Sequence, residues 1–552
     1  MNESPLIPHE QHVSEAIGRL VAFALERGML EPLDAGAARN SLLDLLGLAA
    51  PAAGSEELPS WGQGLLDAPD DADRAALAAG LPTAGAGAPE LLRPLLDYAA
   101  ASGMIRDSVT ERDLLDARLM GLLMPRPSET HARFRAAAAE RGIRQATDEF
   151  YRLNIDANYI RLDRVALNRN WIHPTAYGPL EMTVNLSKPE KDPAEIAMLR
   201  SMPPSAYPKC LLCKENMGYA GRADHPARQN HRILPLRLSG ESWFLQYSPY
   251  VYYKEHCIVF RAEHSPMSIT HRTFGRLLEF TEQIPHYFVG SNADLPIVGG
   301  SILSHDHFQG GRHVFPMEEA PVEESFSHSS RPDISYGIVR WPMSVLRLAG
   351  RDRRELAEAA SDVLDAWREY SDPEAEIHAH TEAHGTRIPH NTITPVARRK
   401  EDGVYELDLV LRNNRTSEEH PEGIFHPHRH LHHLKRENIG LIEVMGLAVL
   451  PGRLKAEMEI IAACLSGALQ WEDVAAGADG AAMAPHGRWY AELMQAWGKT
   501  MDREAAMQAV LDSAGDKFLQ VLTDAGVYKR TAEGRAAFKR FAAAAGLQPD
   551  NG

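Results

Sequence analysis

The sequence has 552 residues, 58 Lys plus Arg against 75 Asp plus Glu, a formal net charge of −17, and 44% apolar residues. At roughly 150 residues per domain this length allows two to four domains, and the composition excludes a wholly disordered chain. No stretch approaches the ~20 apolar residues of a membrane span, and the acidic balance argues against a protein that wraps duplex nucleic acid. Any phosphate that the protein binds must therefore meet positive charge or N–H donors locally.

The first 150 residues carry a helical pattern. Apolar residues recur at helical spacing in segments such as 13–25, and clusters of Gly and Pro interrupt the pattern near 52–60 and 80–89. This spacing predicts amphipathic helices. No residues there point to chemistry, so we expect a packing or oligomerisation module. The first residues lack the apolar stretch of a secretory signal and the basic pattern of a transit peptide, which predicts a cytoplasmic protein.

From about residue 151 the composition shifts towards Tyr, Trp, Asn, His and Pro. Short β-type runs appear at 243–247 and 256–260. A further run at 404–412 alternates apolar and polar residues, which predicts a half-buried strand. An acidic stretch at 371–378 precedes that run and suggests that the α/β part has two halves.

After about residue 453 the Ala-rich helical pattern returns. Together these changes predict four segments. They are a helical N-terminal region at 1–150, a first α/β half at 151–370, a second half at 371–455 and a helical C-terminal segment at 456–552.

Two of the four cysteines, Cys210 and Cys213, are separated by two residues. Four cysteines in so long a chain do not make a disulfide framework, so the pair is read as half of a zinc site or as a redox pair. A tetrahedral zinc site needs two further ligands, and His264 and His305 are the candidates. The other two cysteines lie in strand-like and helix-like runs and are predicted to be core residues.

The densest cluster of reactive side chains lies at 292–313. His305 and His307 are two residues apart, so in an extended segment they point to the same face. A metal that holds one imidazole would orient the strand, and the other imidazole, if neutral, is a competent nucleophile towards phosphorus. Its attacking nitrogen must be unprotonated, which requires an acceptor for its other N–H. Gln309 falls on the same face and can donate its amide N–H to phosphoryl oxygens.

These residues lie in longer blocks that resemble the galactose-1-phosphate uridylyltransferases, and within them the class with a long N-terminal extension. The resemblance covers most of 145–455. The matching blocks are 207–216, 225–232, 246–250, 290–301, 304–311 and 437–446.

The resemblance implies an α/β (α+β) fold of two histidine-triad-like halves with antiparallel sheets. It also implies a double displacement in galactose catabolism. UDP-glucose uridylylates the second His of His-x-His, glucose 1-phosphate leaves, and galactose 1-phosphate takes the UMP to give UDP-galactose. We expect these small molecules as partners, no nucleic acid, no membrane, and a homodimer.

Transferred residue by residue, the resemblance places the nucleophile at His307 and the phosphate-binding amide at Gln309. Asn292 and Ser301 would contact the phosphates. Gly299 belongs to the Gly-Gly-Ser segment that lets a phosphate approach the backbone closely.

The same transfer places a structural zinc ion on Cys210, Cys213, His264 and His305. This sequence departs from the better-known class at the residue between the two histidines, which is Asp306 and not proline. Alternation along the strand predicts that Asp306 faces away from both histidines and pairs with a nearby base.

Three further assignments rest on weaker patterns. Glu443 would hold sugar hydroxyls, and Lys188 would meet the sugar phosphate. A second His-rich run at 425–435 offers His430 and His432, with Glu323, as candidate ligands of a second metal, against the alternative of a basic surface loop.

Two other functions stay open at this point. One is another nucleotidyltransferase or phosphorylase of the histidine-triad superfamily, such as a dinucleoside polyphosphate phosphorylase. The other is a zinc-stabilised binding module without catalysis, which would not need Gln309 or the Gly-Gly-Ser segment. The sequence has neither a P-loop nor a dinucleotide-type Gly-x-Gly-x-x-Gly after a strand, which disfavours an ATP- or NAD-dependent enzyme.

Overall fold

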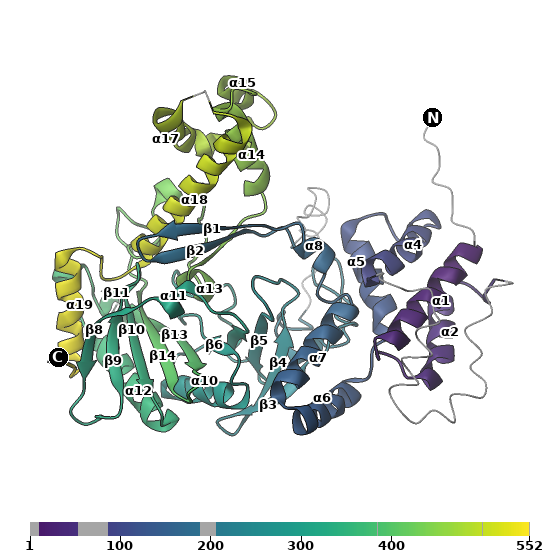
Figure 1. The fold of residues 1–552 in the computed structure, drawn as a ribbon, viewed down its shortest axis with the longest axis horizontal. Helices are drawn as coiled ribbons and strands as arrows, with labels where there is room; N and C mark the ends of the chain where they lie inside the picture. Colours follow the sequence, from purple (N-terminus) through teal and green to yellow (C-terminus); the bar gives the residue numbers. More distant parts are fainter. Residues whose placement is uncertain (1–9, 53–86, 188–205, 384, 499–500, 551–552) are drawn as a thin grey trace.

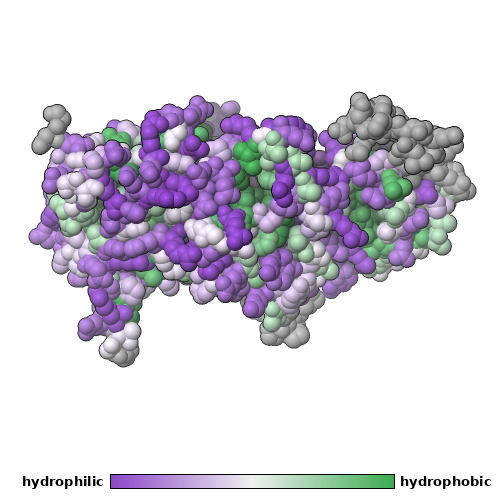
Figure 2. All heavy atoms as spheres, turned by 90° about the horizontal axis from the view of Figure 1, so that it is seen from below, coloured by the Kyte–Doolittle hydropathy of each residue, from purple (hydrophilic) through white to green (hydrophobic). Residues whose placement is uncertain are grey.

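The computed structural model describes residues 10–52, 87–187, 206–383, 385–498 and 501–550. Within these ranges a helical N-terminal region lies beside a large antiparallel sheet, and a helical C-terminal part rises beyond a smaller sheet (Figure 1). No helix in the described part of the chain combines the length and apolar composition needed to cross a bilayer. Hydrophilic residues cover most of the face drawn in Figure 2.

The N-terminal region is helical, as its spacing predicts, and its last two helices extend past the predicted boundary at residue 150, to Val165. Val13, Ile17 and Leu20 are buried along one side of the first helix and share a core with Leu42 and Leu92 of two neighbouring helices. Burial of this apolar stripe holds the helices together. The helices are α1 (Glu10–Glu26), α2 (Ala35–Leu45), α4 (Ala88–Ala101), α5 (Val109–Gly121), α6 (Pro127–Arg141), α7 (Ile143–Asp156) and α8 (Leu162–Val165).

The large sheet has eleven strands, and all its pairings are antiparallel. In spatial order the strands are β16 (Gln548–Pro549), β8 (Val322–Ser327), β9 (Ser335–Val339), β10 (Val345–Gly350), β14 (Tyr405–Asn413), β13 (Asn391–Arg399), β6 (Phe288–Gly290), β7 (His307–Gly311), β5 (Cys257–Arg261), β4 (Glu241–Tyr247) and β3 (Leu234–Leu238).

Ten of these strands form two halves of identical topology. In each half three strands are followed by a helix and two more strands, and the last strand lies between the third and the fourth. The helix is α10 (His271–Gln283) in the first half and α12 (Arg353–Glu369) in the second. The halves meet where β6 pairs with β13, so a pseudo-twofold relationship relates them.

Helices α10 and α12 lie side by side on one face of this sheet (Figure 1). The largest core lies between the helices and the sheet. It contains Trp243 and Phe308 from the first half, and Leu409 and Trp367 from the second. Phe308 stacks on Trp243 with ring centroids 4.8 Å apart. Since strand side chains alternate, burial of Phe308 on this face turns its two neighbours, His307 and Gln309, to the opposite face.

That opposite face is covered by a three-stranded sheet and by short helices. The three strands are β1 (Arg169–Thr175), β2 (Gly178–Val184) and β15 (Leu447–Leu450), with β15 parallel to β2. The short helices are α11 (Pro316–Glu319) and α13 (Leu441–Val444). A separate hairpin pairs β11 (His380–Ala383) with β12 (Thr386–Pro389).

The C-terminal segment is helical, as predicted. Helix α18 packs against α14 and reaches β1, and this group rises at the top of Figure 1. The last strand, β16, returns to the edge of the large sheet beside β8. The helices are α14 (Leu454–Leu465), α15 (Trp471–Ala476), α16 (Gly480–Met483), α17 (Gly487–Trp497), α18 (Arg503–Ala525) and α19 (Ala532–Ala544).

The strand predicted at 404–412 is present as β14, but the prediction that it is half-buried is wrong. Both of its faces are buried. Asp408, on the polar side, is fully buried between Arg347 and Arg398, at 2.7 Å from each. Its alternating sequence therefore reflects a buried ion-pair network and not contact with solvent.

The chain passes from one half of the sheet to the other between β7 and β8. Residue 370, where the sequence suggested a boundary, directly follows α12 and lies inside the second half. The acidic stretch that suggested it is the connection from α12 to the hairpin β11–β12.

Candidate active site and metal cluster

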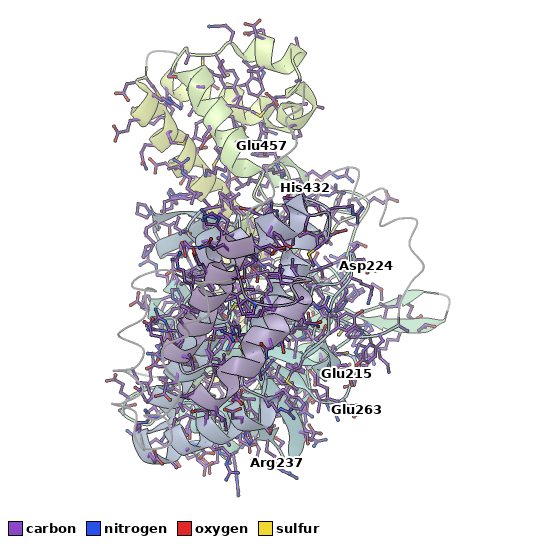
Figure 3. All side chains as sticks on the ribbon, turned by 90° about the vertical axis from the view of Figure 1, so that its right-hand side faces the viewer. Glu215, Asp224, Arg237, Glu263, His432 and Glu457 are labelled. Carbon is purple, nitrogen blue, oxygen red and sulfur yellow. The ribbon has the colours of Figure 1, made fainter. Side chains whose placement is uncertain are left out.

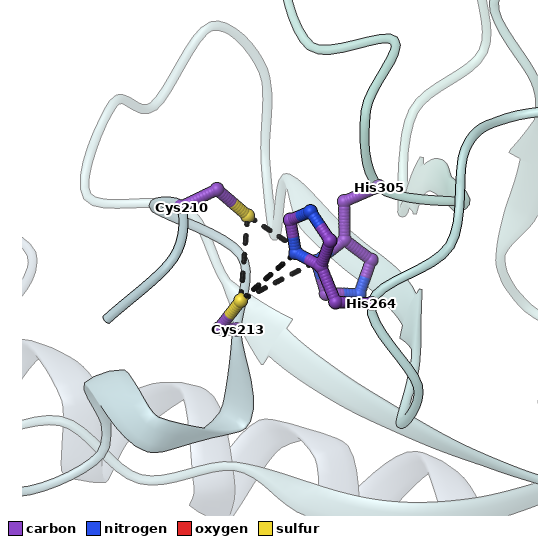
Figure 4. Close-up of side chains that lie close together, drawn as sticks. All are labelled: Cys210, Cys213, His264 and His305. Atoms are coloured by element: carbon purple, nitrogen blue, oxygen red, sulfur yellow. Dashed lines mark hydrogen bonds between the residues drawn. The ribbon is translucent and has the colours of Figure 1, made fainter. Parts of the chain in front are cut away.

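Two thiols and two imidazoles converge beside the first half of the sheet (Figure 4). Cys210 Sγ lies 3.2 Å from His305 Nδ1, and Cys213 Sγ lies 3.2 Å from His264 Nδ1. The two sulfur atoms are 3.6 Å apart, and all four donor atoms lie within 4.8 Å of one another. In a tetrahedral zinc site such donors are roughly 3.3–3.8 Å apart, so this geometry fits a tetrahedral metal ion.

Thiol and imidazole groups are the ligand types that zinc binds. Burial raises the pKa of the Cys213 thiol to about 11, and a bound divalent cation would reverse that shift because it stabilises the thiolate. His305 Nε2 lies 2.8 Å from the carbonyl oxygen of Arg261. A hydrogen bond to that acceptor leaves Nδ1 unprotonated for a metal.

Three separate segments supply the four residues. Cys210 and Cys213 precede the short 3₁₀ helix η2 (Lys214–Asn216), His264 follows β5, and His305 precedes β7. Figure 3 labels one residue from each of two of these segments, Glu215 and Glu263, and both lie towards the same edge of the molecule in that view. The cluster therefore joins the η2 segment to two strands of the sheet.

A buried amide that was not predicted from the sequence shapes the two-cysteine loop. Asn216 Nδ2 donates to the carbonyl oxygens of Cys210 and Cys213, both at 2.8 Å. The other end of this amide, Oδ1, lies 2.6 Å from His225 Nε2. Its position six residues after the first cysteine was the only signal, and a lone Asn does not reveal such a role.

His307 begins β7 and lies on the face of the sheet opposite Phe308. It is 5% exposed, and its Nδ1 lies 2.8 Å from the carbonyl oxygen of His305. A carbonyl only accepts, so Nδ1 carries the proton and Nε2 keeps its lone pair. Burial lowers the pKa of His307 to about 4, which keeps the ring neutral near pH 7.

Gln309 lies on the same face two residues further along β7 and is half-buried. Its side-chain amide is 3.3 Å from His256 Nε2. His256 comes from the loop before β5 and was not singled out from the sequence.

Asp306 lies on the face away from the two histidines, as predicted. Its Oδ2 is 3.5 Å from Arg276 Nη1 of α10, and Arg276 in turn lies over the ring of Trp243. Burial raises the pKa of Asp306 to about 6 against the lowering effect of Arg276. The acid therefore points into the helix-covered side of the sheet and not towards the cavity described below.

The Gly-Gly-Ser segment lies against Asn292. A Cβ atom at Gly299 would meet the carbonyl oxygens of Ala293 and Leu295 at 2.6 Å, and one at Gly300 would meet Asn292 Nδ2 at 2.7 Å. This close approach requires glycine at both positions. Asn292 Oδ1 also accepts from the backbone N–H of Leu441 at 2.8 Å, so the segment is tied to the start of α13.

Glu443 is engaged at both oxygens. Oε1 accepts from Lys435 Nζ at 2.8 Å, and Oε2 accepts from the backbone N–H of Gly440 at 3.2 Å. The residue thus caps α13 and neutralises a buried lysine while it lines the cavity.

A cavity of about 1000 Å³ connects these groups. Asn292, Gly299, Ser301, His307, Gln309 and Glu443 all line it. The N-terminal region supplies another wall through Asp113 of α5 and through Tyr159 and Arg161, which follow α7. The N-terminal helices therefore do more than pack beside the sheet, because they complete the cavity.

Basic side chains line the cavity although the chain is acidic overall. Arg222 is paired with Asp224, and Arg161 lies 3.0 Å from Asp113. Arg228 has no carboxylate within ion-pair distance among the described residues, and its guanidinium lies over the ring of Tyr159. Its charge remains available to an anionic ligand.

Two of the weaker assignments concern Lys188 and a second metal site. Lys188 lies outside the described residues. Glu323 forms a bidentate ion pair with Arg530 at 2.6 Å, and His432 Nε2 contacts the carbonyl oxygen of Pro427. Within the described ranges, the Cys210 cluster is the one group of potential metal ligands found, and neither His430 nor His432 joins one.

Comparison with known proteins identifies relatives along nearly the whole chain. The family model described as galactose-1-phosphate uridyl transferase, N-terminal domain, matches residues 73–266, and that for the C-terminal domain matches 280–475. Galactose-1-phosphate uridylyltransferase of Caldanaerobacter subterraneus subsp. tengcongensis is 51% identical over 532 residues, 96% of this chain and 98% of the relative. The proteins of the same name from Bacillus subtilis and Halalkalibacterium halodurans are both 49% identical, over 97% and 96% of this chain and 98% of each relative.

Among solved structures, yeast Ap4A phosphorylase Apa2 matches 60% of this chain and 88% of its own, at 12% identity and a TM-score of 0.29. A similarity at that level does not bear on function.

Proposed function

The chain belongs to the galactose-1-phosphate uridylyltransferase family of nucleotidyltransferases, and from that premise we propose that it transfers UMP from UDP-glucose to galactose 1-phosphate through a covalent uridylyl-histidine. The observation that carries this proposal is the state of His307. Its Nδ1 is committed to the carbonyl oxygen of His305, so the unprotonated Nε2 is left on a ring that lines the cavity.

In the first half-reaction His307 Nε2 attacks the α-phosphorus of UDP-glucose. An N–P bond forms, the bond from this phosphorus to the bridging oxygen breaks, and glucose 1-phosphate leaves with the bonding electron pair. In the second half-reaction a phosphate oxygen of galactose 1-phosphate attacks the same phosphorus. The N–P bond breaks, UDP-galactose forms, and the neutral imidazole is restored.

The carbonyl of His305 supports both steps. As Nε2 bonds to phosphorus the ring gains positive charge, and the Nδ1–H donated to this carbonyl stabilises that charge. Because Nδ1 stays protonated throughout, the ring needs no proton transfer between the two halves of the cycle.

Cys210, Cys213, His264 and His305 would hold a structural zinc ion, which supplies a closed four-coordinate anchor and no Lewis acid at the phosphate. The residues of the cluster fix the direction of the segment that leads into β7. His307 lies two residues after His305 on the same face, so it would point into the cavity already oriented. Substrate binding energy would then not be needed to position it.

Gln309, Asn292 and Ser301 would meet the phosphates, together with the close backbone approach at Gly299. A neutral amide can donate to an oxyanion without the repulsion that a carboxylate would add. Arg228, which lacks a carboxylate partner in the described part of the chain, would offset the charge of the diphosphate. The carboxylate of Glu443 already accepts hydrogen bonds from Lys435 and Gly440. Sugar hydroxyls would therefore bind only to its remaining lone pairs.

An isotope-exchange experiment tests the double displacement. The enzyme is incubated with UDP-glucose and labelled glucose 1-phosphate, without galactose 1-phosphate. The proposal predicts that label enters UDP-glucose, because the first half-reaction runs reversibly alone. Exchange that requires galactose 1-phosphate would contradict the covalent mechanism. Release of a nucleoside diphosphate driven by inorganic phosphate would instead support the phosphorylase alternative.

A further inference from the structure

His256 lies between the proposed phosphate-binding amide and the backbone of a neighbouring loop. It directly precedes β5, is 3% exposed, and lines the same cavity as His307. Its Nδ1 lies 2.9 Å from the carbonyl oxygen of Tyr250, and its Nε2 lies 3.3 Å from Oε1 of Gln309. Both ring nitrogens therefore have one partner each.

The first contact determines the tautomer. A backbone carbonyl can only accept, so at 2.9 Å the ring must donate through Nδ1–H. The ring is also neutral, because burial lowers the pKa of His256 to about 4 and no carboxylate in the described ranges forms an ion pair with it. A neutral imidazole with its proton on Nδ1 has only a lone pair at Nε2.

The second contact then requires a donor from Gln309. A carbonyl oxygen opposite the Nε2 lone pair would set two acceptors against each other. Rotation of the amide by 180° exchanges its oxygen and nitrogen in nearly the same volume and places the –NH₂ group against His256. One N–H then bonds to His256, and the other remains for a ligand in the cavity.

We propose that His256 is a positioning residue, which accepts one N–H of Gln309 and so fixes the amide with its second N–H towards the α-phosphate. This inference rests on the proposed function for the identity of the ligand. A neutral histidine suits this position because its Nε2 only accepts. A donor at Nε2 would attract the carbonyl of Gln309 and reverse the amide.

Two substitutions of His256 distinguish the role of its Nδ1 from that of its Nε2. Asn in the His256→Asn variant can reproduce the Nδ1 donor to Tyr250 but does not reach the Nε2 position. Gln in the His256→Gln variant places an amide oxygen near the Nε2 position and can accept from Gln309. We expect His256→Asn to slow UMP transfer onto the enzyme about tenfold, the effect of one lost hydrogen bond, and His256→Gln to recover most of that rate.

A double-mutant cycle distinguishes positioning from a general structural effect. If His256 acts through Gln309, the double variant His256→Asn/Gln309→Ala is no slower than Gln309→Ala alone. Multiplicative losses would overturn the proposal, and so would a His256→Gln variant as slow as His256→Asn.

The tautomer can be measured without reference to activity. In the full-length wild-type protein labelled with ¹⁵N-histidine, NMR should show a neutral ring protonated at Nδ1, assigned to His256 by its loss in either variant. A proton on Nε2 would overturn the proposal even if the variants do not fold. If wild-type enzyme forms no uridylyl-enzyme, the proposed function fails, while this spectrum still decides the amide orientation.

Discussion

The Nδ1 atom of His307 lies 2.8 Å from the carbonyl oxygen of His305, whose own Nδ1 faces the sulfur of Cys210 at 3.2 Å. The backbone carbonyl of one residue of the metal cluster thus contacts the ring of the proposed nucleophile, two residues later in the chain. The cluster holds the residue whose backbone sets the tautomer of the next histidine on that face.

The first prediction concerns the metal. Purified protein should contain one zinc ion per chain, and Cys210→Ser should lose it and melt at a lower temperature, because metal binding at such a site is coupled to folding. Elemental analysis and thermal unfolding measure both effects. The matched control is Cys464→Ala in α14, which removes a buried cysteine outside the cluster and should keep its zinc. A redox pair would instead show reversible oxidation of Cys210 and Cys213 in protein that carries no zinc.

The second prediction concerns Gln309. Loss of one preorganised donor to a developing oxyanion typically costs ~10² to 10³ in rate. Gln309→Ala should therefore slow both half-reactions by about that factor with zinc content and melting temperature nearly unchanged. Gln309→Glu, of the same shape but negative, should be at least as slow. Pre-steady-state measurement of UMP transfer decides this. An effect confined to the Michaelis constant for galactose 1-phosphate would move Gln309 to the sugar side.

The third prediction compares two arginines that line the cavity. Arg228 has no carboxylate partner among the described residues, whereas Arg222 is paired with Asp224. A charged hydrogen bond contributes about 1.5–3 kcal/mol, so Arg228→Gln should raise the Michaelis constant for UDP-glucose about tenfold or more. Arg222→Gln should change it far less. Equal effects of the two substitutions would mean that Arg228 does not meet the diphosphate directly.

The fourth prediction concerns Asp116, in the α5 helix of the N-terminal region. Burial raises its pKa to about 6, against the effect of Arg161, while an unfolded Asp titrates near ~3.9. Between these values the folded state holds a proton that the unfolded state has lost. The contribution of Asp116 to the free energy of unfolding is therefore highest below about pH 4 and falls as the pH rises towards about 6.

Asp116→Asn removes that dependence. The melting temperature of the variant relative to wild type should increase from pH 4 to pH 7, which thermal unfolding across this range measures. Protonation of the zinc ligands is common to both proteins and cancels in the difference. A constant difference across the range would show that Asp116 is ionised throughout.

Local periodicity was enough to predict several parts of this fold. The runs at 243–247 and 256–260 are strands β4 and β5, and alternation correctly placed Asp306 opposite His305 and His307. The Cys-x₂-Cys pair and two distant histidines were brought into one set by their family resemblance, and the structure brings their donor atoms together.

Long-range packing was not predictable in the same way. The cavity wall from Asp113 and Arg161, and the contact of His256 with Gln309, depend on how layers and strands separated by tens of residues come together. The full burial of β14 depends on charges that pair across the sheet. Period-2 alternation shows which residues share a face, but it does not show what covers that face.

Covalent labelling tests the proposed uridylyl intermediate on His307 most directly. Enzyme incubated with UDP-glucose labelled in the α-phosphate and quenched should carry acid-labile label, one UMP per chain, on His307. His307→Ala should carry none, while His313→Ala should be labelled like wild type, since His313 is paired with Glu181 at 2.8 Å. Absence of label on wild-type enzyme, or label that persists in His307→Ala, would contradict a covalent intermediate on His307.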